Sequence, residues 1–168
     1  MIVRERAAED LPTCVDALQA VHVADGYPTC WPHDPAGWLS PAGLAAAWVG
    51  LDDDETVLGH VCVVGDVDDP VVAALAGVPV ERLVSVSRLF VSPAARGRGL
   101  GLGAALLARV QRWSEQRGLQ PMLDVVDDGA PAVDLYERLG WRLVIRRDAD
   151  WLAPDGHRHR VRIYLAPE

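Results

Sequence analysis

The chain has 168 residues, a length that suits one domain of ordinary size, and 50% of them are hydrophobic, which is enough for a substantial core. Its formal net charge of -8 argues against bulk electrostatic binding to nucleic acid or to an anionic membrane. The cysteines Cys14, Cys30 and Cys62 are odd in number and have no C-x-x-C spacing, which predicts reduced thiols in a cytoplasmic protein. The N-terminus has no apolar signal-peptide core, and the uncharged stretch 70–80 is too short to span a bilayer.

A strand and two helices are predicted in the N-terminal third. Residues 2–6, two apolar followed by three charged, are predicted to form a short strand. Asp10 is typical of a helix N-cap, and a helix is expected from there to Gly26. The stretch 27–40, rich in proline and tryptophan, is predicted to be an ordered loop. A second short helix is expected to begin at Ser40-Pro41.

The rest of the chain is predicted to alternate strands with helices. Two β-rich runs, 48–51 and 56–64, flank a polar turn and indicate a hairpin, and 67–80 is a connection with room for a short helix. Further strands are expected at 83–91, 122–126, 141–147 and 161–165, and further helices at 99–118 and 131–139.

The resulting order, β-α-α-β-β-β-α-β-α-β-β, predicts a mixed α/β sheet (α+β) in a single domain over residues 1–168. Parallel pairing is expected where strand-helix-strand occurs in the second half, and antiparallel hairpins elsewhere.

A glycine-rich turn, Arg96-Gly97-Arg98-Gly99-Leu100-Gly101, joins the strand 83–91 to the following helix. Glycines let backbone N–H groups turn toward a ligand, and a helix N-terminus adds unpaired donors and a positive dipole end. With two arginines, the turn suits a pyrophosphate. Its spacing is neither that of a Walker A loop nor the G-x-G-x-x-G of a dinucleotide-binding fold. A turn that only packs closely is disfavoured, because each glycine costs about 0.5–1 kcal/mol in a helix.

Two motifs carry a resemblance to a known family. The glycine turn resembles the Q/R-x-x-G-x-G/A signature of the GCN5-related N-acetyltransferases. The segment Ala132-Val133-Asp134-Leu135-Tyr136-Glu137-Arg138-Leu139-Gly140-Trp141 is similar to the family's A-x-x-L-Y-E-x-x-G-F/W segment. Both stand in the family's order, and the element order is similar over nearly the whole chain. The resemblance implies an N-acetyltransferase that moves an acetyl group from acetyl-CoA to an amine by direct attack in a ternary complex. A non-catalytic acyl-CoA-binding sensor on the same fold is the alternative.

The resemblance also implies roles for individual residues. The implied coenzyme-binding residues are Leu89, Phe90, Val91, Arg96, Gly97, Arg98, Gly99, Leu100 and Gly101. A backbone N–H near Val91 would stabilise the oxyanion. Tyr136 is implied as the general acid, because a neutral hydroxyl can protonate the departing thiolate; from the pattern alone, Tyr136 is an aromatic on an apolar helix stripe. Gly129 departs from the family, which often has a pantetheine-binding asparagine there.

The general base stays open. Glu81, His60, His22, Asp124 and a water chain to solvent are all candidates. Arg88 stands near the position where the family usually has an acidic residue. We expect Arg88 to form an ion pair inside the fold, and the alternative is that it binds a carboxylate of the acceptor.

The acceptor side is predicted only in outline. An amine-bearing acceptor could be bound by the carboxylate of Asp25 and the aromatic rings of Tyr27 and Trp31. The alternative is that the tryptophans only attach this loop to the body of the protein. No metal is expected, because His157-x-His159 has no third ligand spaced with it. Small amines, antibiotics, amino acids and protein N-termini all remain as acceptors, and a homodimer is an arrangement that this fold often adopts.

Overall fold

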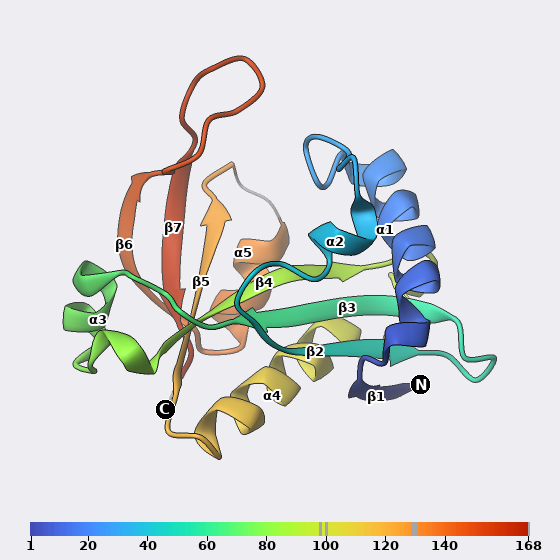
Figure 1. The fold of residues 1–168 in the computed structure, drawn as a ribbon, viewed down its shortest axis with the longest axis horizontal. Helices are drawn as coiled ribbons and strands as arrows, with labels where there is room; N and C mark the ends of the chain where they lie inside the picture. Colours follow the sequence, from blue (N-terminus) through green and yellow to red (C-terminus); the bar gives the residue numbers. More distant parts are fainter. Residues whose placement is uncertain (98, 100, 129–130, 168) are drawn as a thin grey trace. The chain divides into compact units, whose positions relative to one another are not determined.

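Figure 1 shows the computed structural model of the chain, which describes residues 1–97, 99, 101–128 and 131–167. The strands are β1 (Ile2–Glu5), β2 (Leu44–Leu51), β3 (Val57–Val64), β4 (Leu83–Val91), β5 (Gln120–Val126), β6 (Arg142–Asp148) and β7 (Arg160–Leu165). The helices are α1 (Leu11–Asp25), α2 (Pro35–Trp38), α3 (Pro70–Ala76), α4 (Leu102–Glu115) and α5 (Pro131–Arg138). The strand order is β1-β2-β3-β4-β5-β7-β6, with β4 and β5 parallel. The predicted mixed α/β sheet is confirmed.

The chain forms two compact units. The first comprises Met1–Gly65 and Val86–Arg112, and the second comprises Asp66–Ser85 and Trp113–Glu168. Strand β4 and helix α4 each begin in one unit and end in the other. The single domain over 1–168 stays a prediction.

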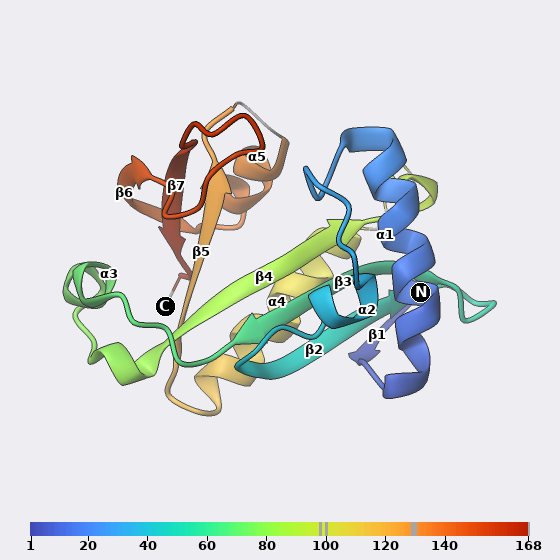
Figure 2. The same ribbon diagram turned by 45° about the horizontal axis from the view of Figure 1, so that its top comes forward.

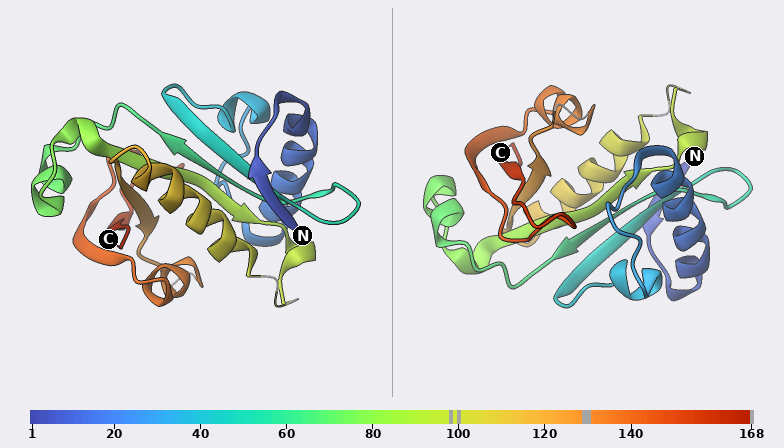
Figure 3. Two further views of the ribbon diagram at one scale, coloured as in Figure 1. Left: turned by 90° about the horizontal axis from the view of Figure 1, so that it is seen from below. Right: turned by 90° about the horizontal axis from the view of Figure 1, so that it is seen from above.

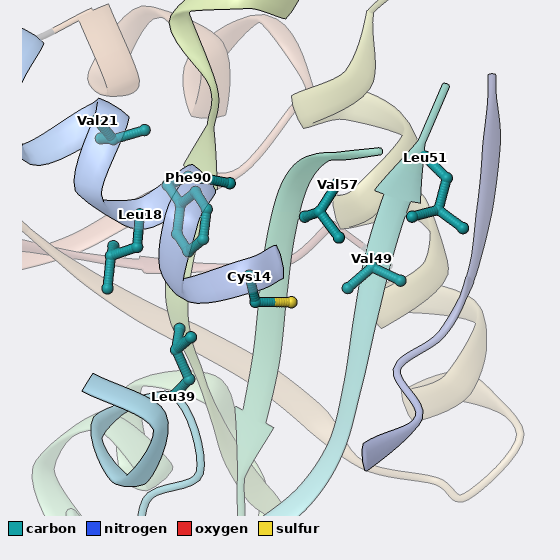
Figure 4. Packing of buried hydrophobic residues seen from close by; sticks show 9 residues of the cluster. Cys14, Leu18, Val21, Leu39, Val49, Leu51, Val57 and Phe90 are labelled. Carbon is teal, nitrogen blue, oxygen red and sulfur yellow. The ribbon is translucent and has the colours of Figure 1, made fainter. Parts of the chain in front are cut away.

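In the first unit, β2 and β3 are covered by different helices on their two faces (Figures 2 and 3). Because side chains alternate along a strand, Val49 and Leu51 share one face, where they pack with α1 (Figure 4). Gly50 lies between them on the other face, where an added Cβ would collide with Leu102 of α4, and Gly59 also lies against Leu102. The two glycines therefore allow α4 a close approach to the strands. The buried core on the α1 side contains Cys14, Ala17, Leu18, Val21, Leu39, Val49, Leu51, Val57 and Phe90.

In the second unit, β7 lies between β5 and β6 and is antiparallel to both. Ile163 and Leu165 of β7 share a core with Val72 and Ala73 of α3, while the ring of the intervening Tyr164 lies near α5. The sequence predicted that β5 and β6, joined by α5, would pair in parallel, but the two strands are not neighbours. Residues 149–159 connect β6 to β7, and this connection is long enough for β7 to lie between β5 and β6.

The prediction of a helix that begins at Ser40-Pro41 is wrong. The second helix is α2, which lies earlier, inside the expected loop 27–40, and Asp34 caps it by accepting the N–H of Gly37 at 3.0 Å. Both positions have a polar residue before a proline, which is a helix-start signal. The later one is overridden because β2 begins at Leu44, already paired with Val64 of β3. Strand β2 is therefore four residues longer than predicted at its start.

Strand β4 contains a left-handed residue within an otherwise extended run. Arg88 has φ 53°, a conformation that costs a non-glycine residue about 1–3 kcal/mol and marks a bulge or kink. Its carbonyl accepts a hydrogen bond from Nδ1 of His60 on β3, at 2.9 Å. His60 is 0% exposed and its ring stacks on Phe90, with centroids 5.5 Å apart. A buried hydrogen bond thus compensates the strained backbone.

The second nitrogen of His60 is also engaged. Nε2 lies 2.9 Å from Nη1 of Arg6, and a guanidinium can only donate, so Nε2 accepts and Nδ1 carries the proton. Arg6 donates further to the carbonyl of Leu39, at 2.7 Å, and to Oγ of Ser40, at 2.8 Å. The neutral His60 ring therefore joins the end of β1, the segment after α2 and the kink of β4.

His60 makes the stability of the fold depend on pH. Burial lowers the pKa of its imidazole from 6.5 to about 4. Between about pH 6.5 and pH 4, His60 is therefore protonated in the unfolded chain but neutral in the folded chain. The free energy of unfolding consequently falls as the pH drops through this interval, by up to about 3 kcal/mol. The variant His60→Asn retains an N–H donor for the Arg88 carbonyl but cannot titrate. Urea unfolding at neutral pH and at about pH 5 should show a larger loss for the wild type than for His60→Asn.

The matched control is His60→Leu, which leaves the Arg88 carbonyl and one Arg6 N–H without their buried partner. It should be less stable than His60→Asn by about 1–3 kcal/mol at neutral pH. Parallel pH curves for the wild type and His60→Asn would show that His60 is not held neutral by the fold.

Candidate functional site

The strand predicted to hold the coenzyme is the C-terminal end of β4, in the first unit. Phe90 is 4% exposed and belongs to the core against α1, while Leu89 and Val91 are half-buried. The carbonyl of Val91 accepts hydrogen bonds from Nε and Nη2 of Arg96, at 3.1 and 2.9 Å. The strand thus ends in a turn that folds back on its last carbonyl.

The glycines of the turn adopt left-handed backbone conformations. Gly97, Gly99 and Gly101 have φ of 67°, 67° and 59°, and no atom lies within 4 Å of a Cβ placed on any of them. The carbonyl of Gly101 accepts the N–H of Ala105 at 3.0 Å, which begins α4. The first N–H groups of α4 have no acceptor within the helix, so they are available to an anion. An open, Cβ-free backbone leading into a helix N-terminus fits a pyrophosphate.

Three positions that the sequence singled out lie outside the described residues. They are Arg98 and Leu100 in the turn and Gly129 before α5.

Arg96 and Asp25, predicted on opposite sides of the reaction, are each other's partner. Nη1 and Nη2 of Arg96 lie 2.9 and 2.5 Å from the two carboxylate oxygens of Asp25, the last residue of α1. The hydrogen bonds from Arg96 lower the pKa of the Asp25 carboxyl below its ordinary value. Both side chains are about 40% exposed, at 42% and 39%, so the pair contributes only about 0–1 kcal/mol of stability. Its effect is to fix the position of the guanidinium and to balance its charge.

The aromatic side chains of the predicted acceptor loop form two separate pairs. Trp31 packs against His22, with ring centroids 5.3 Å apart, and Nδ1 of His22 lies 2.7 Å from the carbonyl of Pro28. Tyr27 packs edge-on against Trp38 at 5.9 Å. Tyr27 and Trp31 are each 37% exposed. The loop is therefore pinned by its rings and still offers aromatic surface to a ligand.

The prediction that Arg88 forms an ion pair inside the fold is wrong for the part of the chain that the structure describes. Its guanidinium carbon lies 4.5 Å above the Trp38 ring, its Nε donates to the Trp38 carbonyl at 3.3 Å, and its Nη1 donates to Oγ of Ser87 at 2.6 Å. Among the described residues no carboxylate pairs with it. Sequence position predicted a charge partner, whereas the folded chain supplies an aromatic ring and neutral oxygens.

The candidates for the general base lie in different environments. His60 is excluded, because both of its ring nitrogens are engaged in buried hydrogen bonds. His22 has Nδ1 on the Pro28 carbonyl. In the second unit Asp124 is exposed on β5, and Glu81 lines a hollow of about 230 Å³ together with Asp66 and Asp68.

Tyr136 lies on α5 in the second unit and is 7% exposed. Its ring contacts those of Trp141 and Tyr164, with centroids 6.1 and 6.0 Å away. Burial, and to a smaller extent the charge of Asp124, raises the pKa of Tyr136 to about 12. Its hydroxyl makes no hydrogen bond with any residue that the structure describes. A protonated, unengaged hydroxyl is what a proton donor needs.

The structure adds residues that the sequence did not assign. Glu137, next to Tyr136, accepts the hydroxyl of Tyr164 at 2.8 Å and lies 3.5 Å from Arg162. Arg162 also donates to Asp127 at 2.6 Å. These contacts attach α5 to β7. Glu137 belongs to the motif quoted above, so its motif position was the available signal, whereas Arg162 lies 35 residues from Asp127 along the chain and gave none.

No group of three or more His, Cys, Asp or Glu side chains in the described part of the chain could hold a metal ion. Nor is any described helix both long and apolar enough to cross a membrane.

The fold is similar to those of several solved acetyltransferases. Arabidopsis thaliana NAA60 in complex with acetyl-CoA matches with a TM-score of 0.73 at 19% identity, covering 98% of this chain and 97% of that one. A ribosomal-protein-alanine N-acetyltransferase from Brucella melitensis gives 0.73 at 16% identity, covering 100% of both. A GCN5-related N-acetyltransferase from Kribbella flavida gives 0.68 at 23% identity, covering 99% of this chain and 97% of that one. At such identities the likeness shows the fold.

No curated protein matches the chain in sequence. The model of the acetyltransferase (GNAT) family, however, matches residues 11–141, a stretch that includes the glycine turn and Tyr136. The chain belongs to the GNAT acetyltransferase family.

Proposed function

We propose that this acetyltransferase uses acetyl-CoA to acetylate an amine by direct attack within a ternary complex. The observation that carries the proposal is the backbone of the turn: three left-handed glycines, open on the side where a Cβ would stand, lead into the N-terminus of α4. N–H groups and the helix dipole can bind the coenzyme pyrophosphate there. NAA60, a fold relative, has been solved with acetyl-CoA bound, which supports this donor.

The charge in the proposed cradle comes from more than one source. Arg96 is already balanced by Asp25, so in the described turn the backbone supplies most of the attraction for an anion. Asp25 is therefore assigned to fixing Arg96 rather than to binding the amine. The main chain of Leu89, Phe90 and Val91 would hold the pantetheine arm, and an N–H near Val91 would stabilise the oxyanion; one such donor is typically worth about 3 kcal/mol.

The reaction needs one proton removed and one supplied. The amine loses a proton to a base or to solvent, its nitrogen bonds to the thioester carbonyl carbon, and the carbon–sulfur bond then breaks to release a thiolate. We assign the proton for that sulfur to Tyr136, whose hydroxyl recovers it from solvent. The raised pKa of Tyr136 keeps this proton in place throughout the ordinary pH range.

The acceptor is proposed to contact the exposed faces of Tyr27 and Trp31, where aromatic surface suits a cationic amine. We propose a cytoplasmic location. It is supported by the three cysteines, all of which are free thiols, with Cys30 exposed.

The function is tested by mixing the chain with acetyl-CoA and a broad panel of amines and following thiol release. The exposed Cys30 reacts with thiol reagents as well, so Cys30→Ser gives the cleaner assay. Thiol release with at least one amine, together with the acetylated product, is the expected result. Coenzyme binding without release for any amine would favour the acyl-CoA sensor instead.

Gly99→Asp should abolish coenzyme binding, because it places bulk and negative charge in the open space beside the proposed pyrophosphate. Calorimetry with acetyl-CoA measures it. The matched control is Gly156→Asp, at another left-handed glycine with open surroundings, φ 85°, which lies in the connection between β6 and β7. It introduces the same charge and a similar backbone strain and should bind the coenzyme normally. Unaltered affinity in Gly99→Asp would place the pyrophosphate elsewhere.

Tyr136→Phe should lower kcat by about 100-fold while leaving coenzyme affinity unchanged, because it removes only the proton donor. Tyr164→Phe is the comparison: its hydroxyl is bonded to Glu137, so its loss should reduce stability by about 1 kcal/mol and change kcat much less. Steady-state kinetics and urea unfolding separate the two. Equal turnover in wild type and Tyr136→Phe would mean that the sulfur receives its proton from another group.

A further inference from the structure

Arg88 is a cation to which no described residue supplies a counter-charge. The residue is half-buried, yet its partners among the described residues are the Trp38 ring, the Trp38 carbonyl and the Ser87 hydroxyl, all of them neutral. The chain carries 24 acidic residues, and none of the described ones pairs with it. A partly buried charge without an opposite charge is costly, so its retention points to a partner that arrives from outside.

The guanidinium is also fixed in direction. Arg88 occupies a left-handed backbone conformation, φ 53°, which turns its side chain differently from the regular alternation of β4. The buried His60 ring holds the Arg88 carbonyl, and Trp38 holds the guanidinium face. Trp38 in turn contacts Tyr27, 37% exposed, on the proposed acceptor loop. A rigid fork beside an exposed aromatic ring is suited to bidentate recognition of an anion.

We propose that Arg88, assisted by the Ser87 hydroxyl, binds the carboxylate of the acceptor, which is therefore an amino acid rather than a simple amine. Arg88 donates to Ser87 Oγ through Nη1, which leaves the hydroxyl proton of Ser87 and the N–H groups of Nη2 for the two carboxylate oxygens. Arg88 precedes Val91 by three residues, about 10 Å along an extended strand. An acceptor whose amine and carboxylate are a few bonds apart spans only part of that interval, and the long side chain of Arg88 has to span the rest. The inference rests on the proposed function for the position of the thioester.

The experiment uses acceptor pairs that differ only in the anion: amino acids and the corresponding amino acid amides, whose carboxylate is replaced by a neutral carboxamide. For each pair, kcat/KM of the acid divided by that of the amide is measured for the wild type and for Arg88→Gln. Dividing the two ratios cancels the different basicity of the paired amines. The acid should lose its advantage by about 10- to 100-fold in Arg88→Gln, as expected for a charge-assisted hydrogen bond. Arg88→Lys, which keeps the charge without the fork, should fall between.

Arg109→Gln is the charge-matched control. Arg109 is exposed on α4 and, within the described part of the chain, donates only to the Val3 carbonyl, so its removal changes the net charge equally and should leave the ratio unaltered. Coenzyme affinity, measured by calorimetry, should be the same in wild type, Arg88→Gln and Arg109→Gln. A loss of coenzyme affinity confined to Arg88→Gln would assign the anion to a coenzyme phosphate and overturn the proposal.

Equilibrium binding of the same pairs to the CoA-loaded chain provides a readout that does not need turnover. Tighter binding of the acids, lost in Arg88→Gln, supports the carboxylate site even if no thiol is released, in which case the proposed function fails alone. Turnover of amines with equal binding and equal kcat/KM for acids and amides would overturn the carboxylate site while the acetyltransferase proposal stands. A ratio unchanged by Arg88→Gln would overturn it too.

Discussion

The hydrogen bond from the buried His60 ring to the Arg88 carbonyl is the interaction on which the first unit depends most. β4 has to supply Phe90 to the core and also depart from regular geometry at Arg88. A left-handed arginine persists only where its surroundings over-determine it. His60 does this with a ring that stacks on Phe90, donates through Nδ1 and accepts through Nε2. A charged imidazole could not accept from Arg6, so the arrangement requires the neutral form.

The same ring connects the kink to the loop that is proposed to meet the acceptor. Arg6 holds Leu39 and Ser40, directly after α2, and Arg88 holds Trp38 at the end of α2. Both arginines donate to carbonyls there, so the segment is fixed from two strands at once. A surface loop would ordinarily vary in position, because few contacts order it. Here these partly buried hydrogen bonds fix the end of the loop, and the bond from Arg88 ties it to β4.

The sequence predicted the elements whose signals are local and missed the contacts that are not. Six of the seven described strands and the helices α1, α4 and α5 were expected close to their observed ranges, because alternation, N-caps and terminal glycines act within a few residues. The helix expected at Ser40-Pro41 failed because pairing of Leu44 with Val64, distant in sequence, overrode the local signal. The position of β7 between β5 and β6 is likewise set by tertiary pairing rather than by local sequence.

The candidate site divides in the same way. The glycine turn was predictable, because left-handed glycines before a helix have a recognisable spacing, and the family match includes both motifs. The pairing of Asp25 with Arg96 was not, since 71 residues separate them. That pair changes the chemistry assigned to both residues. Opposite charges that looked like separate ligand contacts in the sequence neutralise each other in the fold. In the described part of the turn, the backbone is left as the main attraction for the proposed pyrophosphate.

The environment of Tyr136 limits how it can act. Its pKa, raised to about 12, lies above that of a free thiol, roughly 8.5, so full transfer of its proton to the departing sulfur is uphill by several kcal/mol. In the proposed reaction its stronger contribution would be a hydrogen bond that strengthens as negative charge gathers on sulfur, with the proton moving late. Such a donor must be held in place, and the bonds of Glu137 to Tyr164 and Arg162 hold α5. If Tyr136 is the proton donor, as proposed, its burial favours stabilising the leaving thiolate first and protonating it second.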